Sequence, residues 1–168
     1  MRYYYLIELL FLLAVLFGEH LQADELPIGL TEAEKDNIHI IHEMGRDTDP
    51  PESPVRNVAE YERMNGVIIR YPFGISVDII RELAEDVIVY CLVSSSQENS
   101  AISSMSSGNV NINNVQFITG ATDSYWTRDY GPWWVVDGNN NMSIVDFTYN
   151  RPRPNDNDAP LKTSQYLN

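Results

Sequence analysis

Residues 87–93 read VIVYCLV, a continuous apolar run of the kind found in β-strands that are covered on both faces. Two other segments, one on each side of this run, also have the pattern of short strands. They are residues 66–71, which read GVIIRY, and residues 114–118, which read NVQFI. We therefore expect a strand at residues 87–93 that is covered on both faces.

Helical patterns fill the two gaps between these strands. Ser76 can cap a helix that runs through Glu85, with apolar residues gathered on one side. Ser95 and Glu98 have the spacing of a capping box for a second helix, and Gly108 is suited to end it. The order strand–helix–strand–helix–strand predicts an α/β architecture.

A hairpin is predicted later in the chain. Residues 133–137 and 143–149 have the pattern of two antiparallel strands, and residues 138–141, GNNN, are turn residues that tolerate positive φ. The alternative is a calcium-binding loop, but Met142 stands where such a loop needs glycine, and no glutamate follows at the required distance. We favour the plain hairpin.

The first 23 residues have the pattern of a secretory signal. A positive start at Met1 and Arg2 precedes an apolar stretch, interrupted by Glu8, and Ala23 is a small residue suited to cleavage. The alternatives are an N-terminal anchor and a wrongly assigned start codon. The stretch is too short for a stable membrane span. We expect a secreted or periplasmic protein.

Residues 24–53 are predicted to be an N-terminal extension and linker that precedes a domain at residues 54–168. Thr31 and Glu34 match a capping box for a helix that can run to Met44 and stop at Gly45. Its apolar face is thin, so we expect a loosely docked element. The prolines and acids of residues 47–54 are typical of a linker.

Composition limits the partners. The chain has 168 residues, which suits one domain, and a formal net charge of −13. This charge argues against nucleic acid and against an anionic membrane surface, because both need a basic protein surface. An acidic protein attracts cationic substrates.

Cys91 is the only cysteine, so the chain forms no internal disulfide. Because it lies in the apolar run, we interpret it as a buried structural thiol.

Residues 123–134 read DSYWTRDYGPWW and contain all three tryptophans of the chain. Asp129 lies between Trp126 and Tyr130 in a segment that we expect to be a loop between strands. A carboxylate can bind a guanidinium through two parallel hydrogen bonds, and aromatic faces favour a stacked cation. We therefore predict a guanidinium pocket. The alternative is that Asp129 pairs with Arg128 or caps a turn.

Residues 149–156 read YNRPRPND. Proline holds the chain extended, so Arg151 and Arg153 are expected on one side, as a clamp for a carboxylate. The alternative is a solvated basic spot paired with Asp156 or Asp158. Aromatic residues, Asp129 and the two closely spaced arginines together suit a pocket for a flat cation with an anionic tail.

These two motifs resemble those of the Porphyromonas-type peptidylarginine deiminases, within the wider agmatine deiminase group. The resemblance covers residues 54–161. It implies a pentein fold, which is a propeller of five ββαβ units, of which this chain would hold about two. It also implies hydrolysis of an arginine guanidinium to citrulline and ammonia, with no cofactor and no metal.

The resemblance also implies roles for single residues. Asp129 would act in catalysis by gripping the guanidinium, Trp126 would line the same pocket, and Arg151 and Arg153 would contact the carboxylate end of a peptide substrate. Agmatine has no carboxylate, so the arginine pair favours an arginine-containing peptide over agmatine. Agmatine deiminase, with a role in putrescine biosynthesis, and a non-catalytic module that binds arginine peptides stay open as alternatives.

The family also needs a cysteine nucleophile and a histidine general acid and base. The histidines of this chain are His20, His39 and His42, and its one cysteine precedes the DSYWTRDYGPWW motif. We therefore expect an N-terminal fragment of a longer enzyme that is inactive by itself.

Overall fold

A computed structural model describes residues 28–167; the predicted signal segment lies outside them. Three parallel strands form the first sheet, in the order β2 (Gly66–Arg70), β3 (Ile88–Val93), β4 (Val115–Thr119). Gly66 pairs with Ile88, and Val89 pairs with Val115. The predicted strands are confirmed, and each of their boundaries lies within one residue of the prediction.

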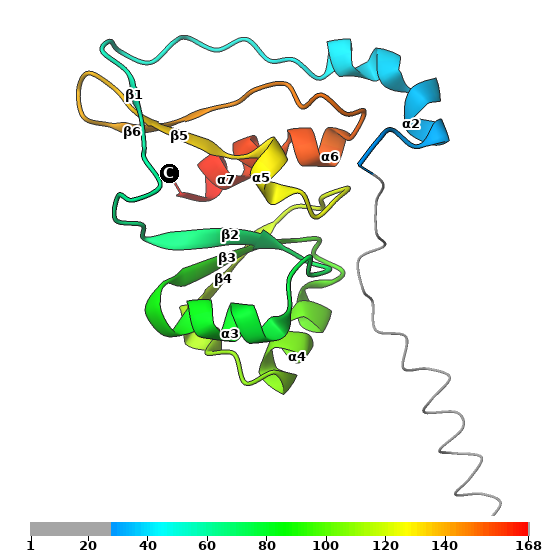
Figure 1. The fold of residues 1–168 in the computed structure, drawn as a ribbon, viewed down its shortest axis with the longest axis vertical. Coiled ribbons are helices and arrows are strands. Elements are labelled where there is room, and N and C mark those ends of the chain that lie inside the picture. Colours follow the sequence, from blue (N-terminus) through cyan, green and yellow to red (C-terminus); the bar gives the residue numbers. More distant parts are fainter. Residues whose placement is uncertain (1–27, 168) are drawn as a thin grey trace, which may run out of the picture.

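Helices α3 (Val77–Asp86) and α4 (Glu98–Ser107) cover one face of this sheet (Figure 1). Ser76 caps α3, and Gly108 ends α4, as predicted. The prediction of a capping box at the start of α4 is wrong. Gln97 is the capping position and makes no side-chain cap bond, because residues 94–97 form a turn in which the Gln97 amide bonds to the Ser94 carbonyl.

The core has two parts, one on each face of the parallel sheet. On the α3 and α4 side, Val89, Cys91 and Val93 pack with side chains from both helices. On the other side, Leu92 packs in a separate cluster with later parts of the chain. The prediction that residues 87–93 are covered on both faces is therefore confirmed.

The second sheet is antiparallel, in the order β1 (Arg56–Asn57), β5 (Trp133–Val136), β6 (Met142–Val145). The predicted hairpin is confirmed, although β6 ends before Phe147 and Tyr149. The carboxylate of Asp137 accepts hydrogen bonds from the backbone amides of Asn139 and Asn141, so it serves the turn of the hairpin.

Three short helices lie between the two sheets (Figure 1): α5 (Thr127–Tyr130), α6 (Pro154–Asn157) and α7 (Ala159–Leu167). The Asp129 segment forms the single helical turn α5, so the prediction that it is a loop is wrong. Neither sheet closes on itself within residues 28–167. The architecture is a mixed α/β fold with small sheets.

The N-terminal segment forms α2 (Glu32–Asp36) and a 3-10 helix, η1 (Ile38–Glu43). The capping box of Thr31 and Glu34 is confirmed. The prediction of one continuous helix to Met44 is wrong. The Asn37 side chain bonds to the Ala33 carbonyl at 2.8 Å, and this bond competes with the helical ladder.

No helix within residues 28–167 combines the length and the apolar character needed to cross a membrane. In the same part of the chain, no three histidine, cysteine, aspartate or glutamate side chains are grouped closely enough to bind a metal ion.

Candidate functional site

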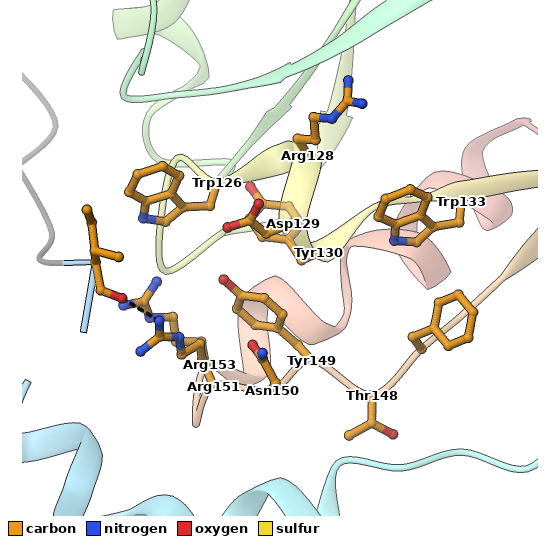
Figure 2. Close-up of a pocket in the computed structure, with 12 residues that line it drawn as sticks. Trp126, Arg128, Asp129, Tyr130, Trp133, Thr148, Tyr149, Asn150, Arg151 and Arg153 are labelled. Carbon is orange, nitrogen blue, oxygen red and sulfur yellow. Dashed lines mark hydrogen bonds between the residues drawn. The ribbon is translucent and has the colours of Figure 1, made fainter. Parts of the chain in front are cut away.

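A cavity of about 830 Å³ lies where α5 faces the segment that follows β6. Figure 2 shows the side chains that line it, with Trp126 and Asp129 on one wall and Arg151 and Arg153 on the other. The cavity therefore brings together all four site residues named from the sequence.

The carboxylate of Asp129 is exposed and faces this cavity (Figure 2). Within residues 28–167, no group forms a hydrogen bond with it. Arg128 turns away from it and pairs with Glu60. The alternatives in which Asp129 pairs with Arg128 or caps a turn are therefore wrong.

Aromatic rings form the rigid part of the cavity wall. The rings of Trp126 and Tyr125 have centroids 4.8 Å apart, and those of Tyr130 and Tyr149 meet edge to face at 5.8 Å. The buried Tyr130 hydroxyl donates to the Ser124 carbonyl at 3.1 Å. Burial raises the pKa of both Tyr130 and Tyr149, so both stay neutral hydroxyls at neutral pH.

Gly131 sets the position of Asp129 by ending α5. Its amide bonds to the Thr127 carbonyl at 3.1 Å, and its φ of 88° lies in the region that favours glycine. An added Cβ would lie 3.0 Å from the Trp133 ring. The glycine of the motif therefore lets the chain turn sharply from α5 into β5, with Trp133 at the cavity edge.

Asp156 joins the two motifs. It is fully buried, and its carboxylate accepts hydrogen bonds from the amides of Asp123 and Ser124 at 2.7 and 3.0 Å. The Asp123 carboxylate in turn accepts two hydrogen bonds from Asn155, at 2.9 and 2.8 Å. Burial raises the pKa of Asp156 despite these hydrogen bonds. This network fixes the wall that carries Asp129 relative to the wall that carries the arginines.

The backbone conformation of residues 151–153 differs from the extended one that the sequence predicts. The Arg153 amide bonds to the Arg151 carbonyl at 2.7 Å, so this segment is a tight turn and is not extended. Both guanidinium groups still line the cavity. The alternative pairing with Asp156 or Asp158 is wrong, because Arg153 pairs with Glu34 and Arg151 donates to the Ile28 carbonyl.

The cavity has a carboxylate on one wall and two guanidinium groups on the facing wall, which suits a ligand that carries both a cation and an anion. No cysteine or histidine of residues 28–167 lines it. Cys91 lies in the core cluster between the parallel sheet and helices α3 and α4. Burial raises the pKa of its thiol to about 12. His39 and His42 lie on η1. Within the described residues, the cavity therefore has no thiolate nucleophile.

Sequence reasoning missed several residues of the site. Tyr149 and Trp133 also line the cavity, and Glu34 reaches Arg153 from the N-terminal segment. Asp156 was considered only as an ion partner for the arginines. The aromatic richness of both motifs was a usable signal for the first two. No local signal could have placed Glu34, because its partner lies 119 residues away.

Comparisons with known proteins bear on the fold and on the family of this chain. The chain is similar to a crystal structure of a provisionally assigned peptidyl-arginine deiminase, with a TM-score of 0.55 and 20% sequence identity. That similarity covers 68% of this chain and 38% of the other, so the chain spans well under half the length of that protein. At this identity the similarity supports the fold.

Residues 73–161, just over half of the chain, match the family of Porphyromonas-type peptidyl-arginine deiminases. The match contains both sequence motifs and all four site residues named from the sequence. The segment at residues 54–72, which the resemblance also included, lies outside it. The chain therefore belongs to the Porphyromonas-type peptidyl-arginine deiminase family.

Proposed function

We propose that this chain supplies the substrate-binding part of a hydrolase that converts an arginine guanidinium to a ureido group. In that reaction water replaces one nitrogen of the guanidinium, which leaves as ammonia, and arginine becomes citrulline. The observation that carries the proposal is the Asp129 carboxylate, which has no hydrogen-bond partner within residues 28–167 and lies in an aromatic cavity opposite Arg151 and Arg153. Membership of the deiminase family supports the same reaction class.

In this proposal Asp129 binds the guanidinium through paired hydrogen bonds, and Trp126 lies against the flat cation. Arg151 and Arg153 bind the carboxylate of an arginine at the end of a peptide. A substrate without a carboxylate, such as agmatine, uses only the first half of the site. The arginine pair therefore favours an arginine-containing peptide as substrate.

The reaction also needs a thiolate to attack the guanidinium carbon and a histidine to transfer protons. Within residues 28–167 neither group lines the cavity, so we propose that the 168-residue chain binds the substrate without converting it. The related proposals are that residues 54–168 form the first units of a pentein propeller, that residues 24–53 precede this domain, and that residues 1–23 direct secretion.

Calorimetry with two ligands tests the proposed site. Agmatine and a dipeptide that ends in arginine are titrated into the chain and into Asp129→Asn. We expect the substitution to weaken agmatine binding about tenfold or more, because a charged hydrogen-bond partner is lost. Glu60→Gln is the control, because Glu60 pairs with Arg128. Agmatine binding that is equally strong in Asp129→Asn would refute the site.

A citrulline assay on the same samples separates binding from catalysis. We expect no citrulline above background from the chain alone. Citrulline formation would show that the chain holds a nucleophile that the described cavity lacks. Binding without turnover agrees equally with a non-catalytic arginine-binding module, so that alternative stays open until the nucleophile is found.

A further inference from the structure

The N-terminal segment, residues 28–46, occupies the arginine end of the cavity. Glu34 Oε1 accepts a hydrogen bond from Arg153 Nε, and the two side chains are only 12% and 7% exposed. The Ile28 carbonyl accepts a hydrogen bond from Arg151, and Ile28 also lines the cavity. Both arginines that would bind a ligand carboxylate are therefore already bound to oxygen atoms of the same chain.

The carboxylate of Glu34 is held from two sides. Its Oε2 accepts hydrogen bonds from the amide and the hydroxyl of Thr31, at 2.8 and 3.1 Å, while its Oε1 faces Arg153. Burial opposes the charge of Glu34, but the hydrogen bonds from Thr31 and Arg153 outweigh it and lower the pKa. At neutral pH the group is therefore a carboxylate, as the end of a peptide would be.

Polar contacts, and not apolar burial, hold the rest of this segment. Neither α2 nor η1 contains a buried residue. The second attachment is Arg46, which pairs with Asp146 and Asp158, each at 2.7 Å, and donates to the Asn157 carbonyl. Partly exposed ion pairs of this kind are weak and are screened by salt. Apart from the buried Glu34–Arg153 pair, the segment is therefore held weakly against a competing ligand carboxylate.

We propose that residues 28–46 form an intramolecular competitor for the carboxylate end of the ligand, with Glu34 in the place of that carboxylate at Arg153. This inference rests on the proposed function. The guanidinium end of the cavity, at Asp129, has no such occupant within residues 28–167. The docked segment therefore admits a guanidinium ligand that lacks a carboxylate and opposes one that ends in arginine.

The competition has a quantitative consequence. The apparent affinity for a peptide that ends in arginine equals the intrinsic affinity multiplied by the fraction of molecules in which the segment is undocked. Coupling between two ligands of one site is reciprocal, so the peptide must also release the segment. Agmatine leaves the segment in place, because it does not need the arginine pair.

The test uses Glu34→Gln in the full chain. Glutamine keeps the capping box, because its side-chain oxygen can accept from Thr31, but it removes the charge that faces Arg153. Glu32→Gln is the matched control, because it removes an exposed charge from the same helix, where Glu32 contacts Lys35. Calorimetry is run with agmatine and with a dipeptide that ends in arginine.

We expect Glu34→Gln to bind the dipeptide about fivefold more tightly or better, and agmatine with unchanged affinity. Hydrogen exchange gives a second readout. The amides of residues 31–44 should exchange faster in Glu34→Gln than in the wild type, and faster in the wild type when the dipeptide is present. Glu32→Gln should behave like the wild type in both experiments.

The outcomes are distinct. Agmatine binding together with unchanged dipeptide affinity in Glu34→Gln would overturn the competitor and leave the guanidinium site intact. Equal exchange of residues 31–44 in Glu34→Gln and in the wild type would also overturn the competitor. Failure of both ligands to bind to every variant would overturn the proposed function, and the competitor with it.

Discussion

The hydroxyl of Ser124 donates a 2.6 Å hydrogen bond to the carboxylate of Asp156, and both side chains are buried. Ser124 lies at the start of the motif that carries Asp129, and Asp156 lies at the end of the motif that carries the arginines. This single contact therefore ties together the two sequence segments that form the cavity.

Replacement of Asp156 should destabilise the protein strongly. Asp156→Ala leaves three donors from Asp123 and Ser124 without a buried partner, at about 1–3 kcal/mol each. We expect a loss of about 3 kcal/mol or more in the free energy of unfolding, measured by urea denaturation. Asp156→Asn should lose less, because the amide oxygen still accepts.

Asp158→Ala is the control for this measurement. Asp158 lies two residues away and pairs with Arg46 at a partly exposed position. We expect a change of about 1 kcal/mol or less. Similar losses for Asp156→Ala and Asp158→Ala would show that the buried network does not stabilise the fold.

Gly131→Ala should also lower stability. The φ of 88° at the end of α5 is strained for a residue with a Cβ, and that atom would crowd Trp133. We expect a cost of about 1–3 kcal/mol, seen in the urea midpoint. Gly29→Ala serves as the comparison, since an added Cβ there meets nothing within 4 Å. An equal response of the two variants would contradict this reading of the turn.

Cys91 should be inert toward alkylation in the folded protein. Burial raises the pKa of its thiol to about 12, so almost no thiolate exists at pH 8, and the side chain is 0% exposed. Mass spectrometry after iodoacetamide treatment should find the native protein unmodified and the urea-denatured protein modified once. Rapid modification of the native protein would show that β3 opens readily.

The Glu34 carboxyl should titrate below its ordinary pKa of 4.5. Because the pKa is lowered by docking, the contact with Arg153 stabilises the docked segment above about pH 4.5 and loses this effect as the pH falls through the docked-state pKa. Carbon-detected NMR of the Glu34 side chain measures it directly. In Arg153→Ala the value should move upward; no movement would mean that the ion pair is not formed in solution.

The sequence was most informative where a pattern is local and repeated. Residues 87–93 must be apolar on both sides, because core clusters lie on both faces of β3, and this requirement is visible in the sequence itself. The two-residue strand β1 could not be predicted. Arg56 and Asn57 show no apolar pattern, and the strand exists through pairing with Val135 and Val136, far along the chain.

The site shows the same division. Asp129, Trp126 and the two arginines could be named because each motif is short and chemically unusual. The backbone around them could not, because α5 is a single helical turn and the arginine segment is a tight turn, and neither is long enough to show a period. The partners of the arginines come from the N-terminal segment, which local patterns do not connect to them.

The separation of Glu34 and Arg153 by 119 residues also has a consequence for biosynthesis. A ribosome that adds about 5–20 residues per second delivers Glu34 many seconds before Arg153. Glu34 is therefore already present in the nascent polypeptide when Arg153 is added. In the proposed scheme each newly made molecule folds with the segment already docked. A peptide that binds later must displace Glu34 from Arg153.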